Sequence, residues 1–311
     1  MRLIFLGTPA FAVPTLERLA ERGHQVLAAV SQPDRPKGRG QALAAPAVKE
    51  AALRLGVPVY QPERLKRPDT VEYLRALAPD AMVVVAYGKV IPQSIIDIPP
   101  LGILNVHASL LPKYRGAGPV QWAIVNGEAV TGITIMQIDA GLDTGPMLLR
   151  TETAIGAEET APELGRRLSW MGADLLAEAL DGLAAGRIVP QPQDHSRATY
   201  APPLKKEDGR IDWSRSAVQI HNQVRGMQPW PGADSSFRGA TLHVWRARPA
   251  AGAAGRAPGS VMRVKPLLVA CGEGSLELLE VQMEGRKRMP AADFVNGHRL
   301  AENEVIGEVS G

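Results

Sequence analysis

The chain has 311 residues, 45% hydrophobic and 22% charged, and its net charge at pH 7 is +3. This length predicts about two domains, and the composition is ordinary for a protein that buries a core. The single cysteine, Cys271, excludes a disulfide framework and a cysteine-based zinc site, and it fits a reducing cytoplasm. None of the six histidines forms an H-x-x-x-H pair, so we expect no metal site.

The sequence gives no indication of membrane targeting. No stretch approaches the ~18 uninterrupted apolar residues that a membrane helix needs. The apolar part of residues 1–11 is too short for a signal peptide and lacks a nearby small-residue cleavage site. We therefore expect a cytoplasmic protein, with a monomer as the default because no segment marks an interface.

The first part of the chain alternates between strand and helix patterns, beginning with a strand at 2–6, a helix at 10–22 and a strand at 26–30. Such units of about 30 residues are typical of a parallel sheet. Further helices are predicted at 46–55, 69–77 and 160–186, and further strands at 57–60, 81–87, 103–107 and 132–138. We predict an α/β fold with a Rossmann-like, mostly parallel sheet.

The pattern changes after this alternation. Residues 187–209 hold four prolines and no helical or strand period, which is typical of a linker. A short helix near 214–226 follows, and then short β-runs at 241–245, 260–264, 267–271 and 275–281, which predict a small barrel. We therefore divide the chain into a Rossmann-like domain at 1–188, a linker at 189–207 and a second domain at 208–311.

Charge is unevenly distributed along the second domain. Residues 210–265 hold nine Lys and Arg against two acids, a local charge of +7, whereas residues 273–308 hold four against eight, a local charge of −4. Such segregation indicates one basic face.

The turn after the first strand does not have the pattern of a nucleotide site. It reads G-T-P-A-F-A and not G-x-G-x-x-G, and no P-loop pattern occurs elsewhere. A dinucleotide would need its phosphates held at this turn, so we do not expect one.

Residues 102–119, GILNVHASLLPKYRGAGP, place Asn105 and His107 two apart at the end of a strand. Side chains two apart on a strand point to the same side, and ligands of open α/β sheets bind at the carboxyl ends of strands. An amide donor beside an imidazole can hold a developing oxyanion. The alternative is that both side chains only satisfy backbone groups of the following loop.

Two acids and two glycines follow the next strand, in DAGLDTGPM at 139–147. Gly141 and Gly145 permit a tight backbone. One carboxylate, of Asp139 or Asp143, is expected to pair with His107 and to favour its imidazolium form, while the other caps a turn. Turn capping by both is the alternative.

The loop QPDRPKGRG at 32–40 carries Arg35, Lys37 and Arg39. A basic loop directly after a strand end could close over an anionic partner. The alternative is a solvated surface loop.

These segments give the chain a resemblance to the methionyl-tRNA formyltransferase family, within the wider superfamily of formyltetrahydrofolate hydrolases and transferases. The resemblance extends from one end of the chain to the other. Besides the segments at 32–40 and 102–119, it rests on FLGTP at 5–9, VVVAYGKVIP at 83–92, TGITIMQIDAGLDTGPML at 131–148, IDW at 211–213, QPWPGA at 228–233 and LELLEVQMEGRKRM at 276–289.

The resemblance implies a reaction and its catalytic residues. The donor would be 10-formyltetrahydrofolate and the acceptor the α-amino group of methionine on the initiator tRNA. Asn105 would donate a hydrogen bond to the oxyanion, His107 as imidazolium would stabilise it, and Asp143 would orient His107 and take or relay the proton of the amine.

The resemblance also implies binding residues and the nature of the second domain. The folate site would be lined by Ser109, Leu110, Leu111, Pro112, Tyr87, Ile91, Asp139 and Gly141. Phe11 would touch the methionine side chain, and Arg39, with Arg35 and Lys37, would contact the acceptor stem of the tRNA. The second domain would be an OB-like barrel that binds tRNA.

Three other functions share part of this pattern. A formyltransferase for a small amine or amino sugar would keep the Asn105, His107 and Asp143 pattern without the basic loop and barrel. A formyltetrahydrofolate hydrolase would use water as acceptor. An RNA-binding protein on an inactive scaffold would not need all three residues.

Overall fold

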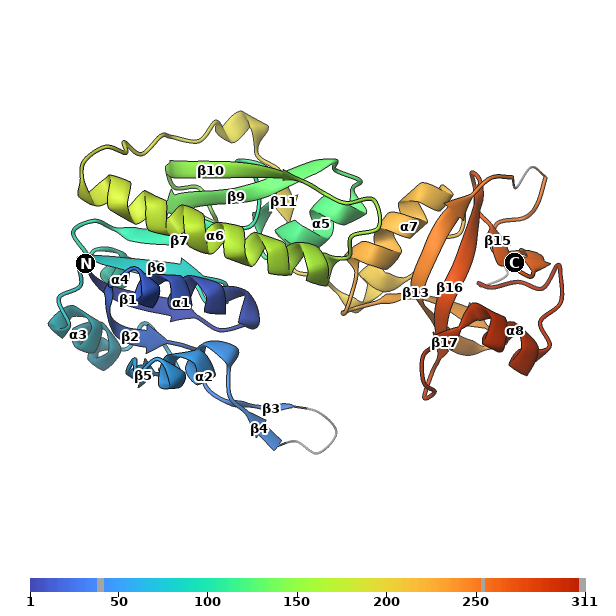
Figure 1. The fold of residues 1–311 in the computed structure, drawn as a ribbon, viewed down its shortest axis with the longest axis horizontal. Helices are drawn as coiled ribbons and strands as arrows, with labels where there is room; N and C mark the ends of the chain where they lie inside the picture. Colours follow the sequence, from blue (N-terminus) through green and yellow to red (C-terminus); the bar gives the residue numbers. More distant parts are fainter. Residues whose placement is uncertain (38–41, 253–254, 308–311) are drawn as a thin grey trace. The chain divides into compact units, whose positions relative to one another are not determined.

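The computed structural model describes residues 1–37, 42–252 and 255–307, which divide into two compact units (Figure 1). The first unit comprises 1–119, 130–154 and 165–202. The second comprises 120–129, 155–164 and the chain from residue 203 onward. The second unit is therefore assembled from three separate stretches of sequence.

A seven-stranded sheet in the order β10-β9-β7-β6-β1-β2-β5 forms the centre of the first unit. Its strands are β1 (Arg2–Gly7), β2 (Gln25–Val30), β5 (Val59–Tyr60), β6 (Ala81–Val85), β7 (Ile103–His107), β9 (Val130–Gln137) and β10 (Met147–Ala154). The strands from β7 to β5 run parallel, whereas β9 is antiparallel to β7 and β10 is antiparallel to β9. This confirms the predicted mostly parallel sheet.

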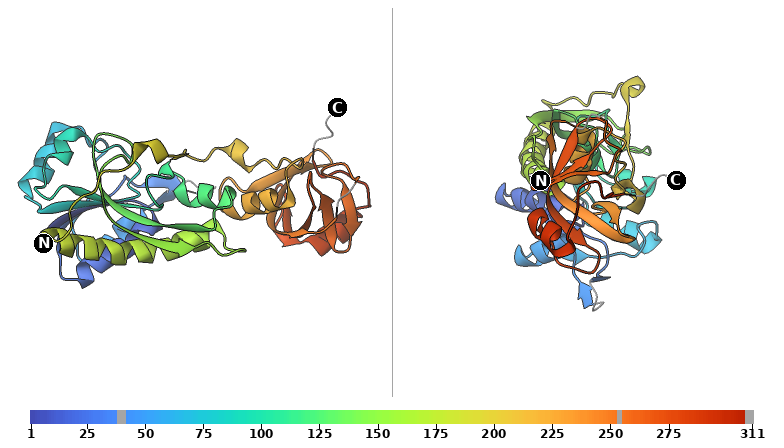
Figure 2. Two further views of the ribbon diagram at one scale, coloured as in Figure 1. Left: turned by 90° about the horizontal axis from the view of Figure 1, so that it is seen from above. Right: turned by 90° about the vertical axis from the view of Figure 1, so that its right-hand side faces the viewer.

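Helices cover both faces of this sheet. Helices α1 (Val13–Glu21) and α6 (Ala161–Ala184) lie on one face, and α3 (Pro68–Ala76) and α4 (Gln93–Ile96) lie on the other (Figures 1 and 2). The apolar side chains beneath α3 and α4 form a buried core that includes Leu74, Met82 and Val84.

Strand β7 presents alternate residues to the two faces, as its spacing predicts. Val106 faces α6, where a Cβ added to Gly172 would overlap the Val106 methyl group. Asn105 lies in register with Val84 of the opposite core. Asn105 and His107 therefore share the face away from α6.

A second, antiparallel sheet with the order β12-β13-β16-β15-β14 forms the second unit, and β17 pairs with β16. Its strands are β12 (Ala233–Phe237), β13 (Ala240–Ala250), β14 (Val261–Val264), β15 (Leu267–Ala270), β16 (Ser275–Met283) and β17 (Met289–Pro290). Helices α7 (Ala217–Gly226) and α8 (Ala291–His298) pack on it, and Trp213, Phe237 and Phe294 are the large side chains of its core. The prediction of short strands in this part of the chain is confirmed.

The remaining elements of the described chain are short. They are η1 (Ala10–Ala12), β3 (Arg35–Lys37), β4 (Ala42–Ala44), α2 (Ala47–Arg54), β8 (Arg115–Gly116), α5 (Pro119–Val125), η2 (His195–Arg197), β11 (Tyr200–Ala201) and η3 (Lys206–Gly209).

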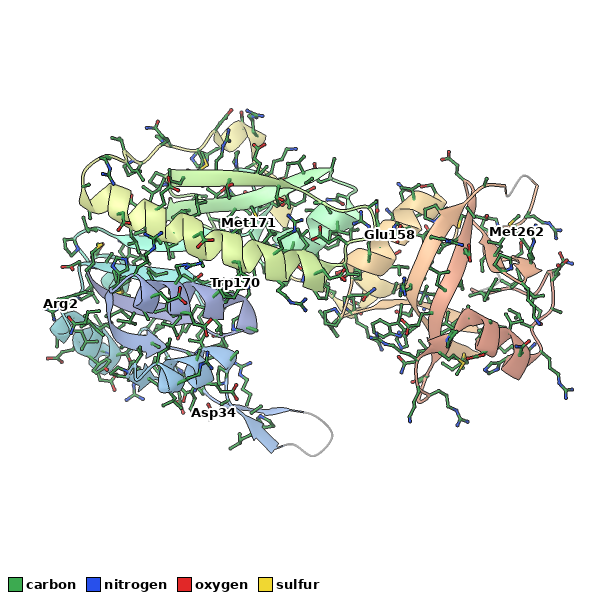
Figure 3. The ribbon with its side chains drawn as sticks, in the orientation of Figure 1. Arg2, Asp34, Glu158, Trp170, Met171 and Met262 are labelled. Atoms are coloured by element: carbon green, nitrogen blue, oxygen red, sulfur yellow. The ribbon has the colours of Figure 1, made fainter. Side chains whose placement is uncertain are left out.

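The segment predicted as a basic loop at 32–40 is partly a strand. Residues Arg35–Lys37 form β3, which pairs antiparallel with β4. Asp34 (Figure 3) fixes the start of this hairpin through a 2.7 Å ion pair with Lys49 and a hydrogen bond from Gln61. The hydrogen bond from Lys49 lowers the pKa of the Asp34 carboxyl. The strand was not predicted because its pairing partner, β4, lies beyond a segment of sequence that is rich in proline and glycine.

The proline-rich stretch from 187 onward also holds regular structure. Gln191 bridges to Met147, and β11 pairs in parallel with β8. The side chain of Gln193 is 5% exposed. Residues 189–202 therefore pack within the first unit, even though they lack a helical or strand period.

The basic excess of residues 210–265 is partly neutralised by acids that are distant in sequence. Arg238 makes a 2.8 Å ion pair with Glu304, and Arg248 makes one of 2.8 Å with Glu277. Arg225 is buried and donates to the backbone oxygens of Gly156 and Glu159. The local charge of +7 counted from sequence therefore overstates the charge that this unit presents to solvent.

Candidate active site

His107 lies at the carboxyl end of β7 and is 5% exposed. Its Nε2 lies 2.9 Å from the backbone oxygen of Tyr114, and its Nδ1 lies 3.7 Å from Oδ2 of Asp143. Nε2 is within hydrogen-bond distance of its oxygen, whereas the 3.7 Å separation at Nδ1 is that of a charge pair and is longer than a hydrogen bond. The structure thus pairs His107 with Asp143.

Asp143 is held from two sides in the loop after β9. Its Oδ2 accepts a 2.8 Å hydrogen bond from the backbone N–H of Gly116, and its own backbone has a φ of 51°, in the left-handed region. That conformation is uncommon for a residue with a Cβ and persists where surrounding contacts impose it. Its side chain keeps 18% exposure, which leaves the carboxylate open on one side.

Asp139 has the turn-capping contacts that we predicted for one of the two acids. Its Oδ1 accepts from the backbone N–H of Gly141 at 3.0 Å and from the Thr144 hydroxyl at 2.6 Å. Glycine is required at 141 and 145, because a Cβ would overlap the Thr144 hydroxyl at the first position and the Gln137 carbonyl at the second. These contacts fix the shape of the loop that carries Asp143.

Asn105 is half-buried two residues before His107 and lies on the same face of the sheet. In register it sits between Val84 of β6 and Met136 of β9. The structure therefore brings an amide, an imidazole and a carboxylate to one edge of the sheet. An amide and an imidazolium are hydrogen-bond donors suited to a developing negative charge, and the carboxylate is suited to accept a proton.

Residues 109–112 form a turn that is anchored to β9. The Thr134 hydroxyl donates to the backbone oxygen of Ser109 at 2.7 Å and accepts from the Leu111 N–H at 3.1 Å. The Ser109 hydroxyl donates to the Lys113 oxygen at 2.6 Å. Leu110 and Pro112 are half-buried, so this turn combines apolar side chains with a fixed backbone beside His107.

The Tyr87 side chain is buried in the core beneath α3 and α4, together with Ile91. Burial raises the pKa of the Tyr87 phenol to about 12. Its hydroxyl oxygen has no hydrogen-bond partner among the described residues. Its backbone oxygen accepts from Thr8 at 3.1 Å and from Gln32 at 2.8 Å.

The residues predicted to contact the acceptor lie apart from the His107–Asp143 pair in sequence. Phe11 is half-buried in η1. Arg35 is exposed and donates to Gln32 at 2.8 Å. Lys37 ends β3, and Arg39 lies outside the described residues.

Two buried residues beside the site were not predicted from the sequence. Arg115 is 2% exposed, and it donates to the Gln193 side-chain oxygen from Nε at 3.2 Å and from Nη2 at 2.6 Å. The Gln193 amide nitrogen donates to the backbone oxygens of Asp143 and Gly145 at 2.9 and 2.8 Å. The only sequence signal that could have pointed to them is the arginine that precedes a glycine in YRG at 114–116.

Two features are absent from the described residues. They contain no group of three or more His, Cys, Asp or Glu side chains arranged to hold a metal ion. Within the same ranges, no helix combines the length and apolar character needed to cross a bilayer.

Comparison with known proteins defines the class to which this fold and site belong. The formyl transferase family model matches residues 1–180, and the model of the formyl transferase C-terminal domain matches residues 203–299. The chain belongs to the formyl transferase family.

Two relatives with high sequence identity indicate which kind of formyl transferase this chain resembles. The chain is 66% identical over 308 residues to the methionyl-tRNA formyltransferase of Solibacter usitatus, covering 99% of both chains. It is 52% identical over 310 residues to the methionyl-tRNA formyltransferase of Citrifermentans bemidjiense, covering 99% of this chain and 97% of the relative. These matches confirm the resemblance found in the sequence.

Among solved structures, the fold is similar to that of HypX from Aquifex aeolicus in complex with tetrahydrofolic acid. The TM-score is 0.65 at 20% identity, and the match covers 95% of this chain and 47% of that one. At this identity the similarity concerns the fold alone.

Proposed function

We propose that this protein transfers the formyl group of 10-formyltetrahydrofolate to the α-amino group of methionyl initiator tRNA. The observation that carries the proposal is the 66% identity, over nearly the whole chain, to a methionyl-tRNA formyltransferase. The donor and acceptor chemistry of Asn105, His107 and Asp143 at one edge of the sheet supports it.

The proposed reaction needs one nucleophile, one oxyanion site and one proton acceptor. The amine lone pair forms a bond to the formyl carbon, and the electrons of the C=O bond move to oxygen. Asn105 and His107 donate hydrogen bonds to that oxygen. Asp143 takes the proton lost by the amine, directly or through a water molecule. The oxyanion then collapses, the bond from carbon to N10 breaks, and N10 takes up the proton held by Asp143.

The donor is proposed to bind between the 109–112 turn and the Asp139–Gly141 loop, with the pterin end near Tyr87 and Ile91. The fixed backbone of the turn supports this, because polar heterocycles are commonly bound through backbone groups. Leu110, Leu111 and Pro112 would supply the apolar wall, with Ser109 in the same turn.

The tRNA is proposed to contact the basic segment that includes Arg35, Lys37 and Arg39, and the proposed C-terminal domain at 208–311. Lys and Arg contacts to phosphates give affinity and orientation. Arg246 and Arg263 are exposed in that domain. Replacing Arg246 by Ala is expected to reduce the salt slope of tRNA affinity by about one. An unchanged slope would remove Arg246 from the tRNA surface.

The experiment that tests the function is a formyl-transfer assay with 10-formyltetrahydrofolate and three conditions: methionyl initiator tRNA, free methionine, and no acceptor. We expect formylation only of the charged tRNA. Formylation of free methionine would favour a small-amine enzyme, and formate release without acceptor would favour a hydrolase. No turnover of the donor in any condition would overturn the proposal.

A further inference from the structure

We infer that Arg115 and Gln193 are positioning residues that hold Asp143 against His107. This inference rests on the proposed function, because it concerns the same reaction. Neither residue was predicted to take part in the site, and neither belongs to the groups that would touch the substrates.

The Gln193 amide has one orientation that satisfies its neighbours. Its oxygen faces the Arg115 guanidinium, which can only donate, and its nitrogen faces the carbonyls of Asp143 and Gly145, which can only accept. The reverse orientation would place donor against donor and acceptor against acceptor. Arg115 thus fixes the direction in which Gln193 donates.

The backbone conformation of Asp143 needs support from a contact such as the Gln193 hydrogen bond. Its φ of 51° lies in the left-handed region, which is unfavourable for most residues with a Cβ. The Gln193 amide donates hydrogen bonds to the backbone oxygens of Asp143 and Gly145, and these bonds stabilise this part of the loop.

The short strand β8 holds both the carboxylate and the backbone of Asp143. Gly116 of β8 donates to the Asp143 carboxylate at 2.8 Å, and its neighbour Arg115 holds the backbone through Gln193. Strand β8 is itself fixed by pairing with β11, where Arg115 lies opposite Tyr200. Arg115 also donates to His195 at 3.0 Å, which further restrains the guanidinium.

The substitution that tests this is Gln193→Glu, which keeps the shape of the side chain and replaces the amide nitrogen by a carboxylate oxygen. That oxygen would face the carbonyls of Asp143 and Gly145 without a proton to share, so the loop must move. We expect kcat for formyl transfer to fall ~10²-fold, the scale for misplacing a catalytic group by about 1 Å. The matched control is Gln191→Glu, an exposed neighbour whose side-chain contact in the structure is to Val189, and it should leave kcat unchanged.

A positioning role is separated from a merely structural one by repeating Gln193→Glu in an Asp143→Asn background. If Gln193 acts through the Asp143 carboxylate, adding Gln193→Glu to Asp143→Asn should lower kcat by less than ~3-fold. The reason is that the effects of interacting residues are not additive. Equal losses in the two backgrounds, or no loss in the unaltered background, would overturn the inference. Gln193→Met, measured in the same way, replaces Gln193→Glu if the latter does not fold.

The same assays separate this inference from the proposed function. An unaltered protein that transfers no formyl group refutes the function. An active unaltered protein whose Gln193→Glu and Gln193→Met variants are equally active refutes only the positioning role.

Discussion

Among the described residues, two histidines are buried, one in each unit, and both lie near a backbone oxygen and a carboxylate. His107 is 5% exposed and His221 is 7% exposed. Each has a ring nitrogen within hydrogen-bond distance of a backbone oxygen, at 2.9 Å for His107 and 3.0 Å for His221. Each also has a carboxylate oxygen at 3.7 Å, from Asp143 and from Glu158 respectively.

The two pairs differ in how the carboxylate is held. The Asp143 side chain is 18% exposed, and its loop is fixed by Gly116, Gln193 and two obligatory glycines. The Glu158 side chain is 72% exposed in the segment that precedes α6 (Figure 3). The His221 Nε2 that faces Glu158 also lies 3.2 Å from the backbone oxygen of Ala157. A histidine–carboxylate distance alone therefore does not distinguish the proposed active site, whereas the way in which the Asp143 carboxylate is held does.

Displacing the Asp143 loop while keeping the Asp143 carboxylate tests whether the His107 site needs a fixed carboxylate. A Cβ at Gly145 would overlap the Gln137 carbonyl, so Gly145→Ala must shift the loop. We expect kcat to fall ~10²-fold through misplacement of Asp143. The matched control is Gly165→Ala in α6, where a Cβ meets no atom within 4 Å, and it should raise stability by ~0.5–1 kcal/mol. Normal turnover by Gly145→Ala would show that the loop tolerates displacement.

Removing the other buried histidine tests the comparison from the second unit. His221→Phe leaves the backbone oxygens of Ala247 and Ala157 without their imidazole partner. We expect the free energy of unfolding to fall by ~1–3 kcal/mol, the cost of leaving a buried acceptor unsatisfied. Urea unfolding measures this loss. The formyl-transfer rate per folded molecule should be unchanged, and a fall of ~10² in that rate would give His221 a place in the reaction.

The third and smallest effect is expected at Glu158. Because this carboxylate is largely exposed, Glu158→Gln should change the free energy of unfolding by less than ~0.5 kcal/mol. The unfolding midpoint in low and high salt measures it. A destabilisation as large as that of His221→Phe would mean that the ion pair, and not the carbonyl contacts, holds His221 in place.

Much of the first unit could be predicted from the sequence because its signals are local. Continuous apolar runs marked the parallel strands, and the spacing of Asn105 and His107 placed both on one face. The glycines at 141 and 145 marked a tight loop around Asp143, although the sequence left open which acid would meet His107. The structure assigns the turn to Asp139 and the pairing to Asp143.

The parts that could not be predicted depend on contacts between distant residues. Gln193 lies 50 positions from Asp143, in a stretch with no period, so nothing local marks its burial. Arg238 and Glu304 are 66 positions apart, so a count of charges by segment misses their pairing. Strand β3 depends on its pairing with β4, which lies further along the chain.

The central claim is that a fixed carboxylate at Asp143 makes the His107 site catalytic. It is tested most directly by the single-turnover rate of Asp143→Asn with 10-formyltetrahydrofolate and methionyl initiator tRNA, measured beside Glu158→Gln. We expect a loss of ~10²–10⁴ for Asp143→Asn, the range for a positioned acid–base group, and no loss for Glu158→Gln. Equal rates for the two variants would contradict it.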